Sequence, residues 1–258
     1  MDSKSVLVGV GVGVLDLSLV YPLAVLACRR EAGQSLGSAV RAGRLWSGAT
    51  AQLSLIPYSI AVEAGTKAFR DRLELPPVAA ALALSSFVSL GLQPIERVLV
   101  MSQLLQGQQQ APNPVTAIAS FARQHGLAHL YKGLSPLALR EFIYIASISA
   151  VNPWVVSALS RRSGGGALSR GAEAAGAFAV GFSAGLISAP CQTVNAMMKD
   201  EAHNGSRSLS EVVRGEVFGR GLWPGVVRLY YGAATRSTRC GGAGLLYYLC
   251  RTAVGAER

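Results

Sequence analysis

Apolar runs with few charges occupy much of this 258-residue sequence. A helix needs about 20 mostly apolar residues to cross a hydrocarbon core of about 30 Å, and it tolerates few charges. The first run contains one charge, Asp16, and the others contain none. The runs, of which the last is the weakest, are 5–28, 46–62, 76–93, 142–160, 174–198 and 240–250. The sequence therefore predicts a membrane protein with six spans.

The composition agrees with this class and narrows the secondary structure. Half of the residues are hydrophobic and the mean hydropathy is +0.35, which exceeds that of an ordinary soluble domain. The runs are continuous rather than alternating, which favours helices over barrel strands. The net charge of +10 is spread over loops without arginine–aromatic alternation, so we expect anionic lipid or an acidic subunit as partner, and no nucleic acid.

Two short patterns occur three times along the chain. The odd-numbered runs carry a proline near their end, at Pro22, Pro94 and Pro190, where we expect helix kinks. The even-numbered runs open with leucine, two variable residues and glycine, in Leu45–Gly48, Leu130–Gly133 and Leu229–Gly232. This predicts a single domain of three helical hairpins, 1–75, 76–165 and 166–258, with a shortened loop in the first.

Small residues recur in two of the odd-numbered runs. Gly9, Gly11 and Gly13 lie in the first, and Gly181 and Gly185 lie in the fifth. Such positions are typical of helices whose backbones approach closely. A short amphipathic segment, residues 114–125, is predicted to lie along the membrane surface.

The string PIERVLVMSQ, Pro94 to Gln103, followed by GLAHLYKGLSPLALRE, Gly126 to Glu141, resembles the mitochondrial carrier family. The resemblance implies an all-α membrane fold of six transmembrane helices in three tandem two-helix repeats, with short matrix-side helices. It also implies the mitochondrial inner membrane, both termini in the intermembrane space, and bound cardiolipin. Free amides at the starts of the even helices suit a lipid phosphate; the residues predicted there are Tyr131, Lys132, Gly133, Gly48 and Gly232.

The sequence departs from the family at both predicted gates. The family places an acid and a base after each kink proline, but these positions hold Ala24, Ala27, Glu96, Leu99, Gln192 and Asn195. We interpret Glu96 and the bracing Gln103 as gate remnants. Arg29 or Arg97 could reach Glu96 from neighbouring turns, and Gln192, Asn195 and Asn152 could supply hydrogen bonds. The outer acid positions hold Lys67, Asn152 and Arg251, so we expect both ionic networks to be lost.

A few polar residues are predicted to face the central cavity. Arg140, Glu141 and Arg239 occupy the family's substrate-contact level, and Arg236 shares a helical face with Arg239. An arginine–glutamate pair resembles the contact site of amino-acid carriers. The alternative is that Arg140 and Glu141 pair with each other or with Arg239, as buried charges must.

Two functional hypotheses follow. In the first, the chain is a non-transporting or weakly transporting accessory or structural subunit of a larger inner-membrane complex, such as a respiratory or ATP synthase complex. In the second, it is a divergent carrier of a small amino acid or carboxylate by alternating access. We expect no enzyme activity, cofactor or metal site, because no nucleophile–base arrangement can be assembled and the four cysteines are scattered.

Overall fold

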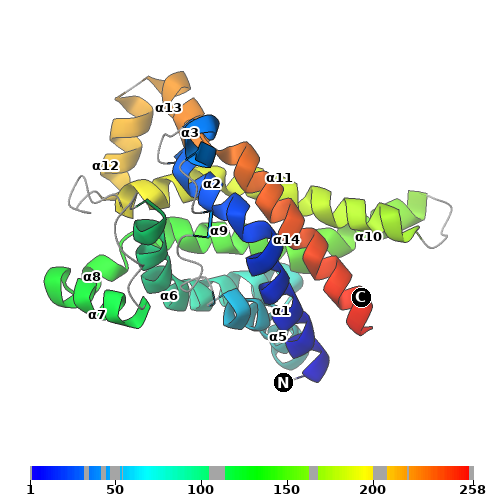
Figure 1. Ribbon diagram of the computed structural model, residues 1–258. Coiled ribbons are helices and arrows are strands. Elements are labelled where there is room, and N and C mark those ends of the chain that lie inside the picture. Colours follow the sequence, from blue (N-terminus) through cyan, green and yellow to red (C-terminus); the bar gives the residue numbers. More distant parts are fainter. Residues whose placement is uncertain are drawn as a thin grey trace.

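The computed structural model describes residues 2–31, 35–41, 45–46, 53, 55–104, 114–162, 168–199, 208–219 and 221–255. Within these ranges the regular structure is entirely helical (Figure 1). The longer elements are α1 (Ser3–Leu15), η1 (Asp16–Val20), α2 (Tyr21–Glu31), α5 (Leu55–Leu73), α6 (Pro77–Leu104), α9 (Leu134–Ala146), η2 (Ser147–Val151), α10 (Asn152–Arg162), α11 (Arg170–Lys199) and α14 (Ala233–Val254). The shorter ones are α3 (Leu36–Arg41), α7 (Pro114–His125), α8 (Leu127–Leu130), α12 (Leu209–Val213), η4 (Arg214–Phe218) and α13 (Leu222–Leu229).

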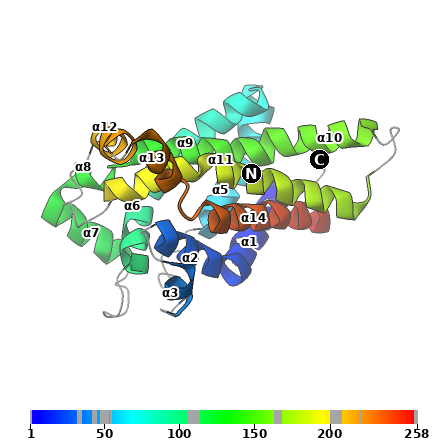
Figure 2. The ribbon, with the colours of Figure 1, turned by 90° about the horizontal axis from the view of Figure 1, so that it is seen from above.

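The long helices form a ring of contacts in chain order. Helix α1 packs on α5, α5 on α6, α6 on α9, α9 on α11 and α11 on α14, and α14 closes the ring on α1. Figures 1 and 2 show both termini toward one end of the bundle and α7, α8, α12 and α13 at the other. The two ends therefore differ, one carrying the chain termini and the other the short helices.

Four stretches are long and apolar enough to cross a membrane: Ser3–Arg30, Pro77–Arg97, Leu127–Arg162 and Arg170–Lys199. The all-helical class is therefore confirmed within the described residues, and the four candidate spans support the membrane class. Helices α5 and α14 are long, at 19 and 22 residues, but more polar. They are not among the candidate spans, and the prediction of six spans stays a prediction.

The second predicted run, 46–62, overlaps α5 from Leu55 onward, and residues 47–52 and 54 lie outside the described residues. Helix α5 continues to Leu73. It passes Glu63 and then four more charged residues in its last two turns. The predicted end of this element was wrong, because the search for charge-free residues ended where the helix becomes polar. The helix continues since its backbone hydrogen bonds do not depend on side-chain polarity.

The repeated prolines lie within helical structure. Pro94 and Pro190 are inside the continuous helices α6 and α11, and Pro22 is the second residue of α2. A π-helical turn, η1, directly precedes α2, and another, η2, joins α9 to α10. Each proline removes one amide donor, but the rest of the helical hydrogen-bond ladder continues past it.

Glycines bring α1 close to α5 and α11 close to α14, as the sequence predicted. A Cβ added at Gly9 would lie 2.5 Å from the Cα of Ile60, and one at Gly181 would lie 2.4 Å from the carbonyl oxygen of Cys240. No real side chain fits at such distances, so a larger residue would push the helices apart.

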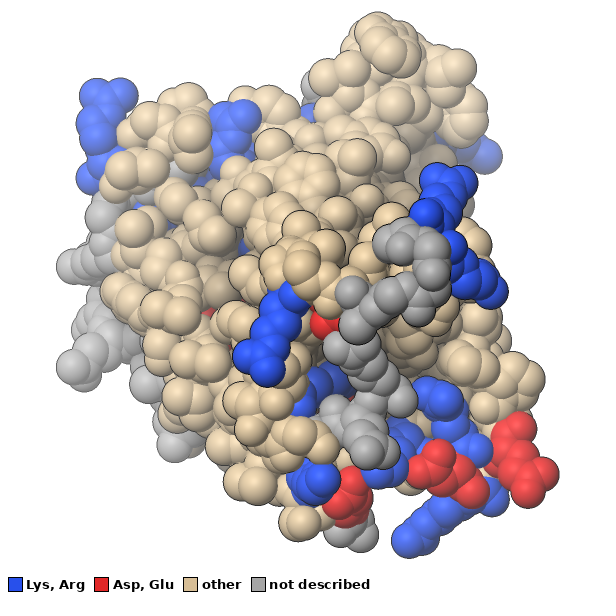
Figure 3. Space-filling model, turned by 90° about the vertical axis from the view of Figure 1, so that its right-hand side faces the viewer, with Lys and Arg blue, Asp and Glu red and all other residues tan. Residues whose placement is uncertain are grey.

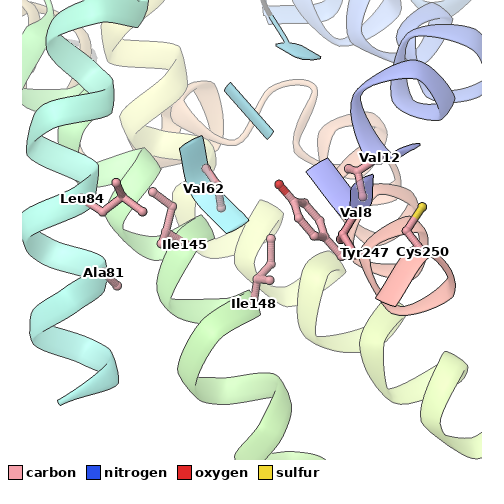
Figure 4. Close-up of a cluster of buried hydrophobic side chains, with 9 residues drawn as sticks. All are labelled: Val8, Val12, Val62, Ala81, Leu84, Ile145, Ile148, Tyr247 and Cys250. Carbon is pink, nitrogen blue, oxygen red and sulfur yellow. The ribbon is translucent and has the colours of Figure 1, made fainter. Parts of the chain in front are cut away.

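Buried apolar side chains join five of the long helices and η2 in one cluster. The cluster contains Val8 and Val12 of α1, Val62 of α5, Ala81 and Leu84 of α6, Ile145 and Ile148 of α9 and η2, and Tyr247 and Cys250 of α14 (Figure 4). Contacts between these helices are therefore made by packed apolar groups as well as by backbone approach.

Candidate functional site

Arg140 of α9 is the centre of a buried charge cluster between α6, α9 and α11. Its Nη2 lies 2.5 Å from Oε1 of Glu96, and its Nε donates to Oε1 of Glu141 over 2.8 Å. Its Nη1 donates to Oε1 of Gln192 over 2.5 Å. The arginine is 7% exposed. Its guanidinium is thus satisfied by two carboxylates and an amide, the arrangement that a buried arginine requires.

Glu96 of α6 joins the cluster to α11 through its second oxygen. Lys199 Nζ lies 3.2 Å from Glu96 Oε2, and Asn195 Nδ2 donates to the same oxygen over 3.2 Å. The side chain of Lys199 is fully buried. Glu96 therefore holds α9 and α11 against α6 by ion pairs to both.

These contacts correct an inference from the sequence. None of the five other positions after the kink prolines is charged, yet Glu96 forms ion pairs to two other helices. These pairs come from Arg140, which was assigned to substrate contact, and from Lys199. The inference that losing the motif charges removes the ionic links at this end was therefore wrong. Gln192 and Asn195 make the hydrogen bonds that were considered for them.

Glu141 connects the cluster to α5. The hydroxyl of Tyr58 donates to Oε2 of Glu141, and the carboxylate's other oxygen accepts from Arg140. Glu96, Glu141, Arg140 and Lys199 together carry two negative and two positive charges. The alternative in which Arg140 pairs with Glu141 is therefore the one observed, and the four charges balance within the cluster.

A second ionic link joins α5 to α14. Arg251 donates from Nε to Oε1 of Glu63 over 3.0 Å and from Nη2 to Oε2 over 2.6 Å. The side chain of Glu63 is 11% exposed and that of Arg251 is 27% exposed. Arg251 stands at a position where the resemblance places an acid, whereas Glu63 is not one of the counted ring positions. No acid stands at the counted acid positions, as the sequence shows, but an ionic link between α5 and α14 is present, so the expectation that this end has lost its ionic contacts was wrong.

Arg239 forms an ion pair apart from Arg140. Its Nη2 lies 3.5 Å from Oδ2 of Asp16, the one charge of the first apolar run. Arg236 is 7% exposed and lies one helical turn before Arg239 on α14. Of the predicted substrate residues, Arg140 and Glu141 therefore lie together in the cluster, and Arg239 pairs with η1.

Glycine starts two of the long helices in the same way. Gly133 precedes α9 with a φ of 85°, and Gly232 precedes α14 with a φ of 87°. A Cβ at Gly133 would lie 2.4 Å from Oδ1 of Asn195. The side-chain amide of Gln93 donates to the carbonyl of Lys132. Lys132 and Gly133, which are predicted to bind cardiolipin, therefore lie next to the charge cluster. The neighbouring Tyr131 is 40% exposed.

Two predicted residues cannot be placed in this site. Gly48 lies outside the described residues, and of Gln103 only the backbone, within α6, is described. Two residues of the cluster, Lys199 and Tyr58, were missed by sequence reasoning. Lys199 had a signal, because it is the first charge after the run 174–198 and lies toward the same end of its helix as Glu96 does. Tyr58 had none.

At the end that carries the N-terminus, Asp2 caps α1 and contacts α5. Its carboxylate accepts from the Lys4 amide over 3.2 Å and from Lys67 Nζ over 2.7 Å. The hydrogen bond from Lys67, followed by that from Lys4, lowers the pKa of Asp2 below its usual value. Both side chains are well exposed, so the pair adds little to stability.

The ring of helices, the apolar spans and the buried charges define a multi-pass helical membrane protein. Residues 77–163, from the start of α6 to just beyond α10, match the family model of the mitochondrial carrier protein. This match supports membership of the chain in the mitochondrial carrier family. The comparison with curated proteins found no match.

Proposed function

We propose that this chain is a carrier-fold protein of the mitochondrial inner membrane that acts as an accessory or structural subunit of a larger complex, with little or no transport of its own. The family match suggests a carrier-type mitochondrial membrane protein rather than an enzyme. The observation that carries the proposal is that two separate ionic links join long helices in one conformation. Glu96 links α6, α9 and α11, and Glu63 links α5 to α14.

Alternating access requires two conformations of similar energy, each held by contacts that break in the other. Here both links are present together, and the apolar cluster around Ile145 and Tyr247 joins five of the helices in addition. Opening either end would break one of these links. This favours a bundle that keeps one shape.

The balance of charge at Arg140 supports the same conclusion. A carrier that binds an amino acid needs an arginine for the carboxylate and an acid for the ammonium. Arg140 and Glu141 are instead bound to each other, to Glu96, to Gln192 and to Tyr58. A substrate would have to break these contacts before it gained any.

The second candidate is a divergent carrier of a small amino acid or carboxylate. It is favoured by one observation, that Arg140 and Glu141 lie together as an opposite-charge pair at the family's contact level. In this case the carboxylate of an amino acid would bind Arg140 and its ammonium would bind Glu141, in place of the contact between the two side chains.

Transport assays separate the two candidates. The purified chain is reconstituted in cardiolipin-containing liposomes and tested with labelled amino acids, keto acids and nucleotides. We expect uptake at the background of protein-free liposomes for the wild type and for Arg140→Ala. Uptake that Arg140→Ala abolishes, and that Arg161→Ala at an exposed position of α10 leaves unchanged, would support the carrier and overturn the accessory role.

The accessory role also requires a host complex. After solubilisation of mitochondria in a mild detergent, the chain should migrate on a native gel well above its own 26.9 kDa. Migration as a free monomer under conditions that keep respiratory and ATP synthase complexes intact would contradict this role.

We further propose the sidedness and the lipid. The termini lie toward one end and are assigned to the intermembrane space, with the short helices on the matrix side. Cardiolipin is assigned to the helix starts at Tyr131, Lys132, Gly133, Gly48 and Gly232, since amides there and the Lys132 ammonium suit a dianionic headgroup. Lys132→Gln should weaken cardiolipin retention in native mass spectrometry, with Arg161→Gln as the control.

A further inference from the structure

A groove of about 910 Å³ runs along α5, with walls from α1 and α6. Phe69 of α5 lines it, and six further residues of this helix recur every three or four positions and form one continuous stripe. These are Pro57, Ile60, Ala61, Ala64, Gly65 and Ala68. At 1.5 Å per residue the stripe is about 16 Å long. Because four of its six residues are alanine or glycine, the stripe is hollow where larger side chains would fill it.

The walls of the groove are largely apolar. Leu84, Phe87 and Val88 of α6 line it on one side, and Ser5 of α1 lines it on the other. Phe87 is 73% exposed, so the groove opens at the outer surface of the bundle rather than into its interior. A long apolar furrow that opens at the outer surface, beside the candidate spans that contain α1 and α6, matches an acyl chain in length and polarity.

Charged residues line the groove beyond the apolar stripe. Lys67 and Arg72 supply two cations, and Asp2 and Asp71 supply two carboxylates. Lys67 is paired with Asp2 over 2.7 Å, and all four side chains reach solvent. On the face shown in Figure 3, charged side chains likewise gather along the lower edge, and most of the area above them is uncharged. The groove therefore continues from apolar walls to a charged rim with equal numbers of each sign.

We propose that this groove is a specific site for a phospholipid with a zwitterionic, amine-bearing headgroup of the phosphatidylethanolamine class. One acyl chain lies along the α5 stripe, the phosphate contacts Arg72 and Lys67, and the ammonium contacts Asp71 and Asp2. A dianionic headgroup would meet the two carboxylates, which is why the balanced rim favours a headgroup that carries both charges. The inference requires a membrane-embedded bundle and holds whether or not the chain transports a solute.

The test is native mass spectrometry of the purified full-length chain in detergent, with phosphatidylethanolamine, phosphatidylcholine or cardiolipin added at equal concentration. We expect one retained phosphatidylethanolamine per chain. Ala61→Phe and Ala68→Phe should lower its retention at least fivefold by filling the stripe. Ala179→Phe, at an exposed alanine on α11, is the matched control and should retain the lipid.

The rim is tested with two neighbouring arginines. Arg72 lines the groove, whereas Arg70 is exposed two residues away and does not. Arg72→Gln should weaken retention about threefold to tenfold, and Arg70→Gln should leave it unchanged. These substitutions are on the surface, so they keep the test valid if the phenylalanine variants fail to fold.

Two results would overturn the proposal. Equal lipid retention by all variants would show that the bound lipid is only annular. Loss of retention in Ala61→Phe and Arg72→Gln, combined with tighter binding of cardiolipin or phosphatidylcholine than of phosphatidylethanolamine, would overturn the assigned headgroup.

Discussion

At the scale of single residues, Glu96 of α6 connects three helices through its side chain. One oxygen pairs with Arg140 of α9, and the other pairs with Lys199 and accepts from Asn195 of α11. A buried carboxylate is costly unless its lone pairs are filled, and here both oxygens are occupied. Removing its charge leaves two buried cations with one carboxylate, Glu141, between them.

We expect Glu96→Gln to lower the free energy of unfolding by about 3–5 kcal/mol, the usual range when one partner of a buried ion pair is removed. Thermal unfolding of the purified protein in detergent measures this. Glu74→Gln, at an exposed residue, is the control and should change the free energy by less than about 0.5 kcal/mol. Equal effects of the two variants would show that the cluster contributes no stability.

The Glu63–Arg251 pair allows a test by exchange of charges. Glu63→Arg places two cations together and should lower the free energy of unfolding by about 1.5–3 kcal/mol, the range for hydrogen bonds to charged groups. Combining it with Arg251→Glu restores opposite charges and should recover most of the loss. A double variant no more stable than Glu63→Arg would mean that the pair is not a specific link between α5 and α14.

At the scale of elements, a glycine precedes each of the helices α8 and α9. The two glycines share a positive φ but differ in the space around them. Gly126 and Gly133 have φ of 84° and 85°, a region that disfavours side chains. A Cβ at Gly126 meets nothing within 4 Å, whereas one at Gly133 would collide with Asn195. The second glycine therefore fits α9 against α11 next to Glu96.

This difference predicts unequal costs for the same substitution. Gly126→Ala should lower the free energy of unfolding by about 1–3 kcal/mol, the cost of placing an L-residue at φ 84° and ψ 156°, a region that glycine alone adopts readily. Gly133→Ala should cost at least twice as much, since Asn195 must also move from Glu96. Urea or thermal unfolding compares the two, and similar costs would show that the approach of α11 is not tight.

At the scale of the whole molecule, the apolar cluster and the ionic links act on the same helices. The cluster joins α1, α5, α6, α9 and α14, and the charged pairs join α6, α9 and α11 as well as α5 and α14. Every helix of the ring is thus held by at least one of the two. This is the physical basis for a bundle of fixed shape.

Packing inside the ring predicts a difference between two isoleucines. Ile145 is fully buried in the cluster, and Ile187 of α11 is 61% exposed. Ile145→Ala should lower the free energy of unfolding by about 2–4 kcal/mol through the cavity it leaves, as large-to-small changes in cores do. Ile187→Ala should cost below about 1 kcal/mol, because lipid or detergent replaces the lost contacts. Equal costs in thermal unfolding would contradict a packed interior.

Much of the fold follows from local patterns that the sequence displays openly. The apolar runs and the recurring glycines predict helices and close approaches, and Gly9 and Gly181 pack as expected. Spacing alone was less reliable. Gly225 has the same separation from Gly232 as Gly126 has from Gly133, yet Gly225 lies inside α13, and it is Gly221 before this helix that has the positive φ, of 86°. The backbone around each glycine, rather than its count from a motif, sets its role.

The sequence by itself predicted helices and apolar spans, and its motifs resemble those of the mitochondrial carriers, because hydropathy and motif spacing are properties of neighbouring residues. Only the tertiary structure decided which charges meet. Lys199 lies over 100 residues from Glu96, and Arg251 lies 188 residues from Glu63, so their pairing depends on how the helices pack around the ring. Since an ion pair needs proximity rather than a fixed position in a motif, substitution of the family's ring residues did not remove the links between helices.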